Sequence, residues 1–171
     1  MNVPSCRSCN CLAFFAAVGA MAFALYLEHV DGLEPCPLCI FQRVAMISTA
    51  LIFLAAFIHH PKLIGQRVYA VLAVIASGTG IAVAGRHSWL QHLPPDEVPA
   101  CGPGLNYLLE AFPMVDVFQI VFNGSGECAS IDWYFLGLTL PEVTLLVFVG
   151  FSLFAIFQFF YSKVCHLKEA A

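Results

Sequence analysis

The chain has 171 residues, of which 60% are hydrophobic and 11% are charged, and its mean hydropathy is +0.84. Soluble globular domains are less apolar than this, so the composition predicts a membrane protein about the size of one small helical bundle. The net charge is -4, and the seven basic residues form no patch that could follow a phosphate backbone. Nucleic acid is therefore not expected as a partner.

Four apolar stretches are long enough to cross a lipid bilayer as helices. They cover residues 11–27, 40–58, 68–84 and 143–161. No internal repeat or low-complexity segment divides the chain, so a single domain over residues 1–171 is the economical interpretation. We expect an all-α membrane protein, a bundle of four transmembrane helices in the lipid bilayer. Its long outer loop, residues 85–142, is expected to carry a short interfacial helix.

The first apolar stretch has an alternative interpretation as a secretory signal. Arg7 provides a basic flank, and Ala20-Met21-Ala22 matches a cleavage site. The length of the apolar run and the cysteines in its N-terminal flank favour a retained membrane span.

The second stretch begins at a Cys-x-x-Cys motif formed by Cys36 and Cys39, with Arg43 one helical turn further on. A disulfide between such close cysteines closes a small ring and gains little loop entropy, so the pair is typical of redox chemistry. Prolines on both sides of Cys36 favour a helix start, where the helix dipole stabilises a thiolate. Arg43 falls on the same helix face and adds a permanent cation. Half of a zinc site is the alternative, but no further ligand pair stands nearby in the sequence, so we expect no metal.

The basic residues predict how the chain crosses the membrane. With four spans, most of them fall on one side, which is then cytoplasmic: Arg7, Lys62, Arg67, Lys163 and Lys168. Both termini are therefore expected in the cytoplasm, and the Cys-x-x-Cys pair and the loop 85–142 on the opposite, oxidising side.

Four cysteines fall on the cytoplasmic side of this topology: Cys6, Cys9, Cys11 and Cys165. The cytoplasm keeps thiols reduced, so we expect these four to be reduced bystanders. A metal site is the alternative, because Cys6 and Cys9 have the spacing of zinc ligands.

The outer loop contains two further cysteines. Prolines and glycines around Cys101 favour an extended, exposed chain, whereas Cys128 follows an amphipathic stretch at 114–122 and a Gly-rich turn. A disulfide between them would close a loop of about 28 residues and stabilise the fold by roughly 3.6 kcal/mol in the chain-entropy model. A structural staple would thus suffice for this pair alone. The Cys-x-x-Cys pair on the same membrane face also makes disulfide exchange between two pairs feasible.

Together these features resemble the DsbB family of bacterial disulfide-generating membrane proteins, and the resemblance covers almost the whole chain. It rests on the four spans, the outer Cys-x-x-Cys followed by Arg43, the pair Arg86-His87 with Leu90-Gln91 behind it, the loop cysteines Cys101 and Cys128, and the run CASIDWYFLGLTLP at 128–141.

The resemblance implies a quinone-dependent thiol oxidoreductase in the bacterial inner membrane. It would oxidise a periplasmic thiol oxidase of the DsbA type by disulfide exchange and pass the electrons to a membrane quinone, ubiquinone or alternatively menaquinone, in support of disulfide bond formation. DsbA is itself a strong oxidant at about -120 mV, and each 30 mV shifts a two-electron exchange about tenfold. Ordinary protein disulfides would reoxidise it poorly, so a stronger electron acceptor is required.

The same resemblance implies the roles of the cysteines. The disulfides would be Cys36–Cys39 and Cys101–Cys128. Cys101 would form the mixed disulfide with the partner, and Cys128 would then attack the first pair at Cys36. Cys39 would be released as a thiolate that faces the quinone.

Two further residues are expected beside the quinone. Arg43 would stabilise the Cys39 thiolate and the charge that develops on the quinone. His87, at the outer end of the third span, matches the family's quinone-side histidine. Without the resemblance, Arg86-His87 is typical of an interfacial flank.

Two other functions stay open at this stage. A quinone reductase similar to vitamin K epoxide reductase would also join a four-helix membrane bundle to a Cys-x-x-Cys motif and a loop cysteine pair. There the loop cysteines precede the motif, whereas Cys101 and Cys128 follow it. A non-catalytic scaffold like a tetraspanin would keep its cysteines permanently oxidised and would have no use for Arg43 at the hydrophobic border.

Overall fold

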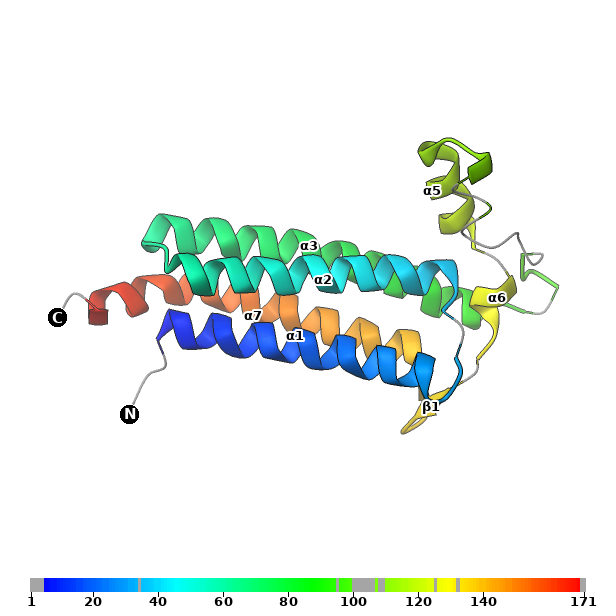
Figure 1. The fold of residues 1–171 in the computed structure, drawn as a ribbon, viewed down its shortest axis with the longest axis horizontal. Coiled ribbons are helices and arrows are strands. Elements are labelled where there is room, and N and C mark those ends of the chain that lie inside the picture. Colours follow the sequence, from blue (N-terminus) through cyan, green and yellow to red (C-terminus); the bar gives the residue numbers. More distant parts are fainter. Residues whose placement is uncertain are drawn as a thin grey trace.

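The computed structural model describes residues 5–169 except 34, 95, 100–106, 108–109, 125 and 132. Within this part of the chain, four helices are long and apolar enough to cross a membrane, which confirms the predicted fold class. They run side by side in one elongated bundle (Figure 1). Their bounds are Cys6–His29 for α1, Pro37–His59 for α2, Leu63–Gln91 for α3 and Leu140–Glu169 for α7.

The helices are longer than the apolar stretches that predict them. Helix α3 continues beyond residue 84 to Gln91, so Arg86 and His87 lie within the helix and not in a flanking segment. Hydropathy falls at these polar residues, but the backbone keeps its helical hydrogen bonds through them. This extension carries His87 into the interior at the end of the bundle where α2 begins, and there it is buried.

Short-range signals explain where helix α2 begins and ends. Cys36 is its N-cap with an extended backbone, and Pro37 occupies the first turn, as the prolines in the sequence predict. The helix stops at His60, which adopts the left-handed conformation at φ 42°. The Cys-x-x-Cys pair therefore lies at a helix N-terminus.

The helices pack around an apolar core in the middle of the bundle. Phe53 of α2 and Phe148 of α7 are completely buried in it. Helix α3 approaches α7 closely at Gly80, where a β-carbon would lie 2.4 Å from the Phe148 ring. The outward faces are also apolar, with Leu12 and Ile64 exposed, which suits a surface in contact with lipid. Helix α1 packs along α2 within this bundle.

Three amide side chains hold the end of the bundle that carries the termini. Asn10, Gln66 and Gln158 come from α1, α3 and α7 and are almost completely buried. Asn10 exchanges hydrogen bonds with Gln66, and the Gln158 amide donates to Asn10 at 2.9 Å. Such a network satisfies polar groups that would otherwise be costly in an apolar setting and aligns the three helices.

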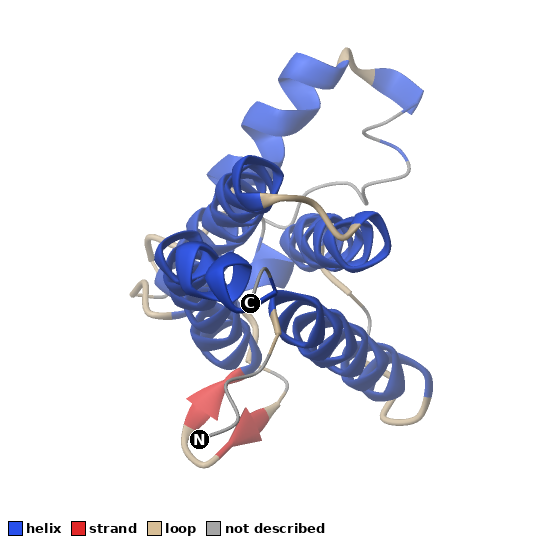
Figure 2. Ribbon diagram, turned by 90° about the vertical axis from the view of Figure 1, so that its left-hand side faces the viewer, coloured by secondary structure: helices blue, strands red, loops and turns tan. Residues whose placement is uncertain are grey.

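The chain between α3 and α7 forms the opposite end of the molecule. It contains α5 (Met114–Asn123), α6 (Gly126–Ala129) and a hairpin of β1 (Tyr134–Phe135) and β2 (Leu138–Thr139). The amphipathic stretch 114–122 is thus a helix, as predicted, and its Val117 and Val121 pack against the bundle. Figure 2, which looks along the bundle, shows α5 and the hairpin projecting on opposite sides.

Candidate active site

The two cysteines of the Cys-x-x-Cys motif face one another at the start of α2. The structure holds both as thiols, with the Sγ atoms of Cys36 and Cys39 3.2 Å apart. At this distance the two sulfurs are in contact, and removal of two electrons and two protons from the two thiols would close the predicted disulfide.

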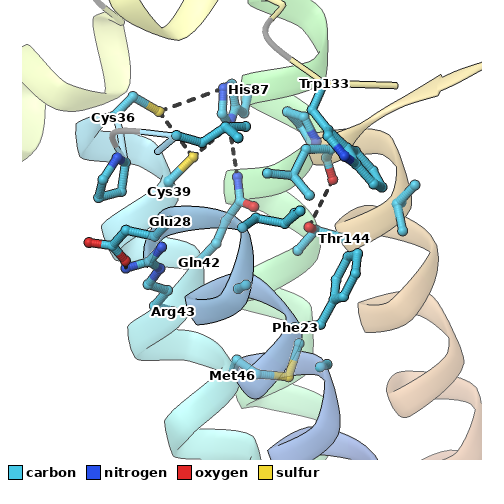
Figure 3. Close-up of a pocket in the computed structure, with 18 of the residues that line it drawn as sticks. Phe23, Glu28, Cys36, Cys39, Gln42, Arg43, Met46, His87, Trp133 and Thr144 are labelled. Atoms are coloured by element: carbon cyan, nitrogen blue, oxygen red, sulfur yellow. Dashed lines mark hydrogen bonds and ion pairs between the residues drawn. The ribbon is translucent and has the colours of Figure 1, made fainter. Parts of the chain in front are cut away.

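His87 of α3 lies against both sulfurs (Figure 3). Its Nε2 atom is 3.7 Å from the Cys36 Sγ atom, and its Nδ1 atom is 3.9 Å from the Cys39 Sγ atom. Gln42, one turn into α2 and also buried, donates its amide to Nδ1 at 3.0 Å. A neutral imidazole that accepts at Nδ1 carries its proton on Nε2, so that proton points toward Cys36.

Arg43 lies on the same wall of the site, as the helical spacing predicts, and it has a partner that the sequence did not suggest. Its guanidinium forms an ion pair with Glu28 near the end of α1, at 2.5 Å. Both side chains are about one quarter exposed, at 22% and 27%. The cation next to Cys39 is therefore compensated by a carboxylate from another helix. Figure 3 shows the two side chains together below the cysteines.

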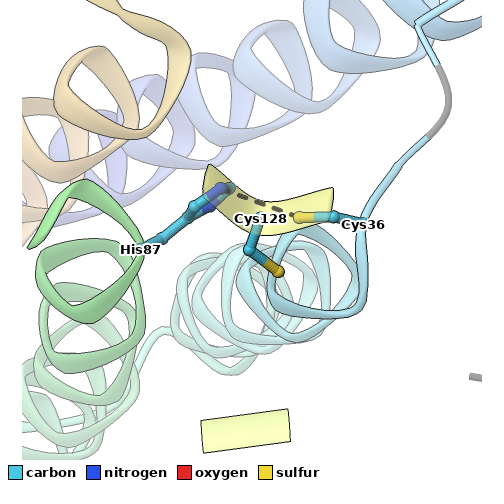
Figure 4. Close-up of side chains that lie close together, drawn as sticks. All are labelled: Cys36, His87 and Cys128. Atoms are coloured by element: carbon cyan, nitrogen blue, oxygen red, sulfur yellow. Dashed lines mark hydrogen bonds between the residues drawn. The ribbon is translucent and has the colours of Figure 1, made fainter. Parts of the chain in front are cut away.

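Cys128, in α6 of the segment between α3 and α7, lies beside Cys36 and His87 (Figure 4). Its Sγ atom, the Cys36 Sγ atom and a ring nitrogen of His87 all lie within 4.8 Å of one another. Cys128 is 1% exposed, and its pairing with Cys101 stays a prediction. Cys101 itself lies outside the described residues.

Side chains near the end of α3 tie the Cys128 segment to the bundle. Arg86 donates from Nε to the Phe122 carbonyl and from a terminal nitrogen to the Asn123 carbonyl, both at 3.0 Å. Gln91 donates to the Ser130 carbonyl at 3.0 Å, on the other side of Cys128. Two anchors therefore bracket the cysteine and hold it over the start of α2.

A cavity of about 320 Å³ opens beside Cys39. Gln42, Arg43 and His87 contribute polar side chains to its wall, and α1 and α7 contribute most of its apolar residues. Trp133 closes one side and makes an edge contact with Phe23 of α1, with ring centroids 5.8 Å apart. The volume is within the range of small-molecule sites, about 300–1,000 Å³. The arrangement suits a flat, mostly apolar ligand with a few hydrogen-bond acceptors.

Sequence reasoning missed three residues of this site: Glu28, Gln42 and Trp133. Their signals are weak, because each belongs to a common local pattern. Glu28 is an acidic residue at the end of a span, Gln42 is one polar residue in an apolar helix, and Trp133 is an aromatic residue in a loop. Only their meeting in one cavity distinguishes them.

One expectation about the inner cysteines is wrong. Cys6 is disulfide-bonded, whereas Cys9 and Cys11 are thiols. Sequence position predicts the compartment of a cysteine but not whether another sulfur is brought beside it by packing. For Cys165 the helix is described but the side chain is not.

Comparisons with known proteins agree with the geometry. The family model "Disulfide bond formation protein DsbB" matches residues 6–158. The chain is 48% identical to disulfide bond formation protein B of Methylococcus capsulatus over 158 residues, which are 92% of this chain and 96% of the relative. The protein of the same name from Acinetobacter baumannii is 54% identical over 157 residues, 91% of this chain and 92% of the relative. That from Hahella chejuensis is 51% identical over 146 residues, 85% of this chain and 88% of the relative.

Proposed function

Because the chain belongs to the DsbB family, whose members oxidise DsbA and transfer the electrons to quinone, we propose which of its residues carry each step. The protein is a quinone-dependent thiol oxidoreductase. Family membership decides against the quinone reductase similar to vitamin K epoxide reductase and against the tetraspanin-like scaffold. The single observation that carries the assignment of roles is the convergence of Cys36, Cys128 and His87.

The electrons enter through the loop cysteines. A DsbA-type periplasmic partner reduces the Cys101–Cys128 disulfide and leaves with its own disulfide formed. The thiolate of Cys128 then attacks Cys36 in the Cys36–Cys39 disulfide, which forms a Cys128–Cys36 bond and releases Cys39 as a thiolate. Attack by Cys101 on Cys128 breaks that bond, restores the loop disulfide and leaves Cys36 and Cys39 as the dithiol. Two electrons and two protons are thereby moved from the partner to the pair at the start of α2.

The packing of Cys128 supports attack at Cys36. Both cysteines are buried on the same side of α2, and their sulfurs lie within 4.8 Å of each other, close to reacting distance. Both cysteines of the motif line the cavity, and Cys39 is the less buried of the two. This difference supports Cys39 as the sulfur that faces the electron acceptor and Cys36 as the sulfur that receives Cys128.

His87 and Gln42 control protons at this exchange. Gln42 orients the imidazole through Nδ1, so that Nε2 can hold a proton beside Cys36. A thiolate formed at Cys36 accepts a hydrogen bond from the Nε2–H group, which stabilises the negative charge on the sulfur. The burial of His87 keeps bulk water away from this proton.

The residues of the cavity fit a quinone head group. A quinone is flat and apolar with two carbonyl acceptors, and here Arg43 and Gln42 offer donors beside His87. When bound, the quinone supplies the oxidising power by accepting the two electrons and two protons of the Cys36–Cys39 dithiol. Arg43 offers a positive charge near the acceptor, while Glu28 keeps the cation in place. We propose ubiquinone, because it is a stronger oxidant than menaquinone and DsbA is already strongly oxidising.

The chain is proposed to lie in the bacterial inner membrane with both termini in the cytoplasm. Helix α1 begins and α7 ends at one end of the bundle, and the start of α2, α5, α6 and the hairpin are at the other (Figure 1). Arg7 lies in the first turn of α1, and Lys62 and Arg67 lie at the start of α3, which is at the same end of the bundle as the start of α1. The positive-inside rule then directs the cysteine site to the periplasm.

The decisive experiment combines purified protein, reduced DsbA-type partner and a short-chain ubiquinone, and follows quinone absorbance. We expect turnover that stops in the Cys39→Ser variant and continues in a Cys11→Ser variant, because Cys11 lies far from the site on α1. Equal turnover in wild type and Cys39→Ser would refute the assigned roles. A parallel assay with a short-chain menaquinone tests the choice of quinone.

A further inference from the structure

Cys36, His87 and Cys128 bring three metal-ligating atoms together although they are far apart in the sequence (Figure 4). The Cys-x-x-Cys motif alone lacks ligands nearby in the sequence, which is why no metal is expected from it. The fold supplies them from α3 and α6. We propose that the dithiol form of this site binds one zinc ion through these three residues and is thereby withdrawn from electron transfer.

The distances among the ligand atoms are close to those of a tetrahedral zinc site. Zinc lies about 2.3 Å from a thiolate sulfur and about 2.0 Å from an imidazole nitrogen, so sulfur and nitrogen ligands are about 3.6 Å apart and two sulfurs about 3.8 Å apart. The Cys36 Sγ atom and the His87 Nε2 atom are already 3.7 Å apart. All three atoms lie within 4.8 Å of one another, so closure around the metal requires movements of about 1 Å or less.

Gln42 can orient the histidine as zinc sites require once its amide group is turned over. A zinc-bound imidazole usually donates its other ring N–H to a fixed acceptor, which sets the tautomer. Gln42 is bonded to Nδ1 at 3.0 Å and is buried, so the imidazole is already held in place. Rotation of the Gln42 amide by half a turn places its oxygen toward Nδ1–H and leaves the Nε2 lone pair to the metal.

Charge and burial also favour zinc over harder cations. Binding replaces the protons of the Cys36 and Cys128 thiols, so the ion and two thiolates form a neutral unit in a buried place. Thiolate and imidazole ligands select zinc over magnesium and calcium. The Cys39 Sγ atom, 3.2 Å from the Cys36 Sγ atom, is the nearest group for the fourth position.

Metal binding would depend on the redox state of the site. In the Cys36–Cys39 disulfide the sulfur of Cys36 is no longer a thiolate and does not bind zinc, whereas the dithiol does. Zinc would therefore occupy the reduced protein, block its reoxidation and be excluded from the oxidised protein. The inhibition rests on the proposed electron route, but the binding does not.

The test measures zinc binding to the full chain in detergent, without DsbA or quinone, by competition with a chromophoric chelator. A background variant with Cys6, Cys9, Cys11 and Cys165 changed to serine removes the other thiols, and single Cys11→Ser serves as the control if that variant folds poorly. We expect one zinc per reduced chain. Affinity should fall at least about tenfold in both His87→Ala and Cys128→Ser.

Cadmium in place of zinc gives a second readout, because cadmium thiolates absorb in the ultraviolet. The absorption should appear with the reduced protein, weaken in Cys128→Ser and be absent after oxidation of the Cys36–Cys39 pair. Equal zinc affinity in the oxidised and reduced protein, or unchanged affinity in the His87→Ala, Cys128→Ser double variant, would overturn the proposal. Either result would leave the electron route untouched, since that route is tested by quinone reduction.

Discussion

The guanidinium of Arg43 and the carboxylate of Glu28 form an ion pair that joins α2 to α1 on the wall of the cavity beside Cys39. The pair places a compensated cation where a charged group alone would be costly at the border of the membrane. Because Glu28 belongs to α1, the position of that helix affects where the Arg43 guanidinium lies near Cys39. Helix α1 would otherwise contribute mainly apolar residues to the cavity.

Arg43→Ala should raise the apparent KM for quinone about tenfold or more, because a charged hydrogen-bond donor is lost and Glu28 is left without its partner. Arg43→Lys should recover only part of the loss, since an ammonium lacks the planar fork of donors. Steady-state quinone reduction measures both effects. Lys163→Ala, an exposed change in the last turns of α7, is the matched control. An unchanged KM in Arg43→Ala would contradict this role.

Glu28→Gln should affect quinone binding less than Arg43→Ala does but in the same direction. The amide still accepts a hydrogen bond from Arg43 while the carboxylate charge is lost, so the guanidinium is held less firmly. A double-mutant cycle with Arg43→Ala measures the coupling between the two residues. Additive effects would show that the ion pair does not position Arg43.

His87→Ala should slow quinone-linked turnover at least about tenfold, because the group that holds a proton beside Cys36 is removed. Gln42→Met should slow it less and change the pH dependence, since the imidazole stays but its tautomer is no longer set. The pH profile of kcat separates the two variants. A profile for Gln42→Met identical to that of the wild type would remove the positioning role of Gln42.

Arg86→Ala should slow the attack of Cys128 on Cys36. The two hydrogen bonds from Arg86 to the Phe122 and Asn123 carbonyls hold the end of α5, just before the Cys128 segment. In a Cys39→Ser background the Cys36–Cys128 disulfide can be trapped, and its rate of formation with a mild oxidant is the measurement. Lys62→Ala, at the other end of the bundle, controls for general effects of charge. Equal rates with and without Arg86 would argue against the anchor.

The direction of the relay can be tested by trapping the partner. Cys128→Ser should accumulate a mixed disulfide with DsbA through Cys101 when the partner's own resolving cysteine is removed, because no thiol remains to release it. Cys101→Ser should trap no comparable amount. Non-reducing gels and peptide mapping identify the linked cysteine. A partner linked to Cys128 in the Cys101→Ser variant would reverse the proposed order.

Local properties of the sequence determined the membrane spans, the helix start at Cys36 and the helix within the outer loop. Long apolar runs exclude most structures other than membrane-spanning helices. The prolines around the Cys-x-x-Cys motif favour a helix start in the residues next to them. The pattern of cysteines with Arg43 and His87 also led to the correct family, because motif order along a chain is visible without its fold. Even so, hydropathy ended the third span before His87, because it measures apolarity and not helical hydrogen bonding.

Tertiary structure alone decided which side chains meet. The contacts of Glu28 with Arg43 and of Gln42 with His87 join separate helices and depend on the rotation of each helix about its axis. The family resemblance already implied that Cys128 reaches Cys36, and the structure has their sulfurs within 4.8 Å of each other. The rotation of each helix is set by packing, such as the contact of Gly80 with Phe148, and by the buried amides at the far end of the bundle. The sequence carries no local signal for such rotations, since they depend on the shapes of all four helices at once. For the same reason the disulfide at Cys6 could not be inferred from its position.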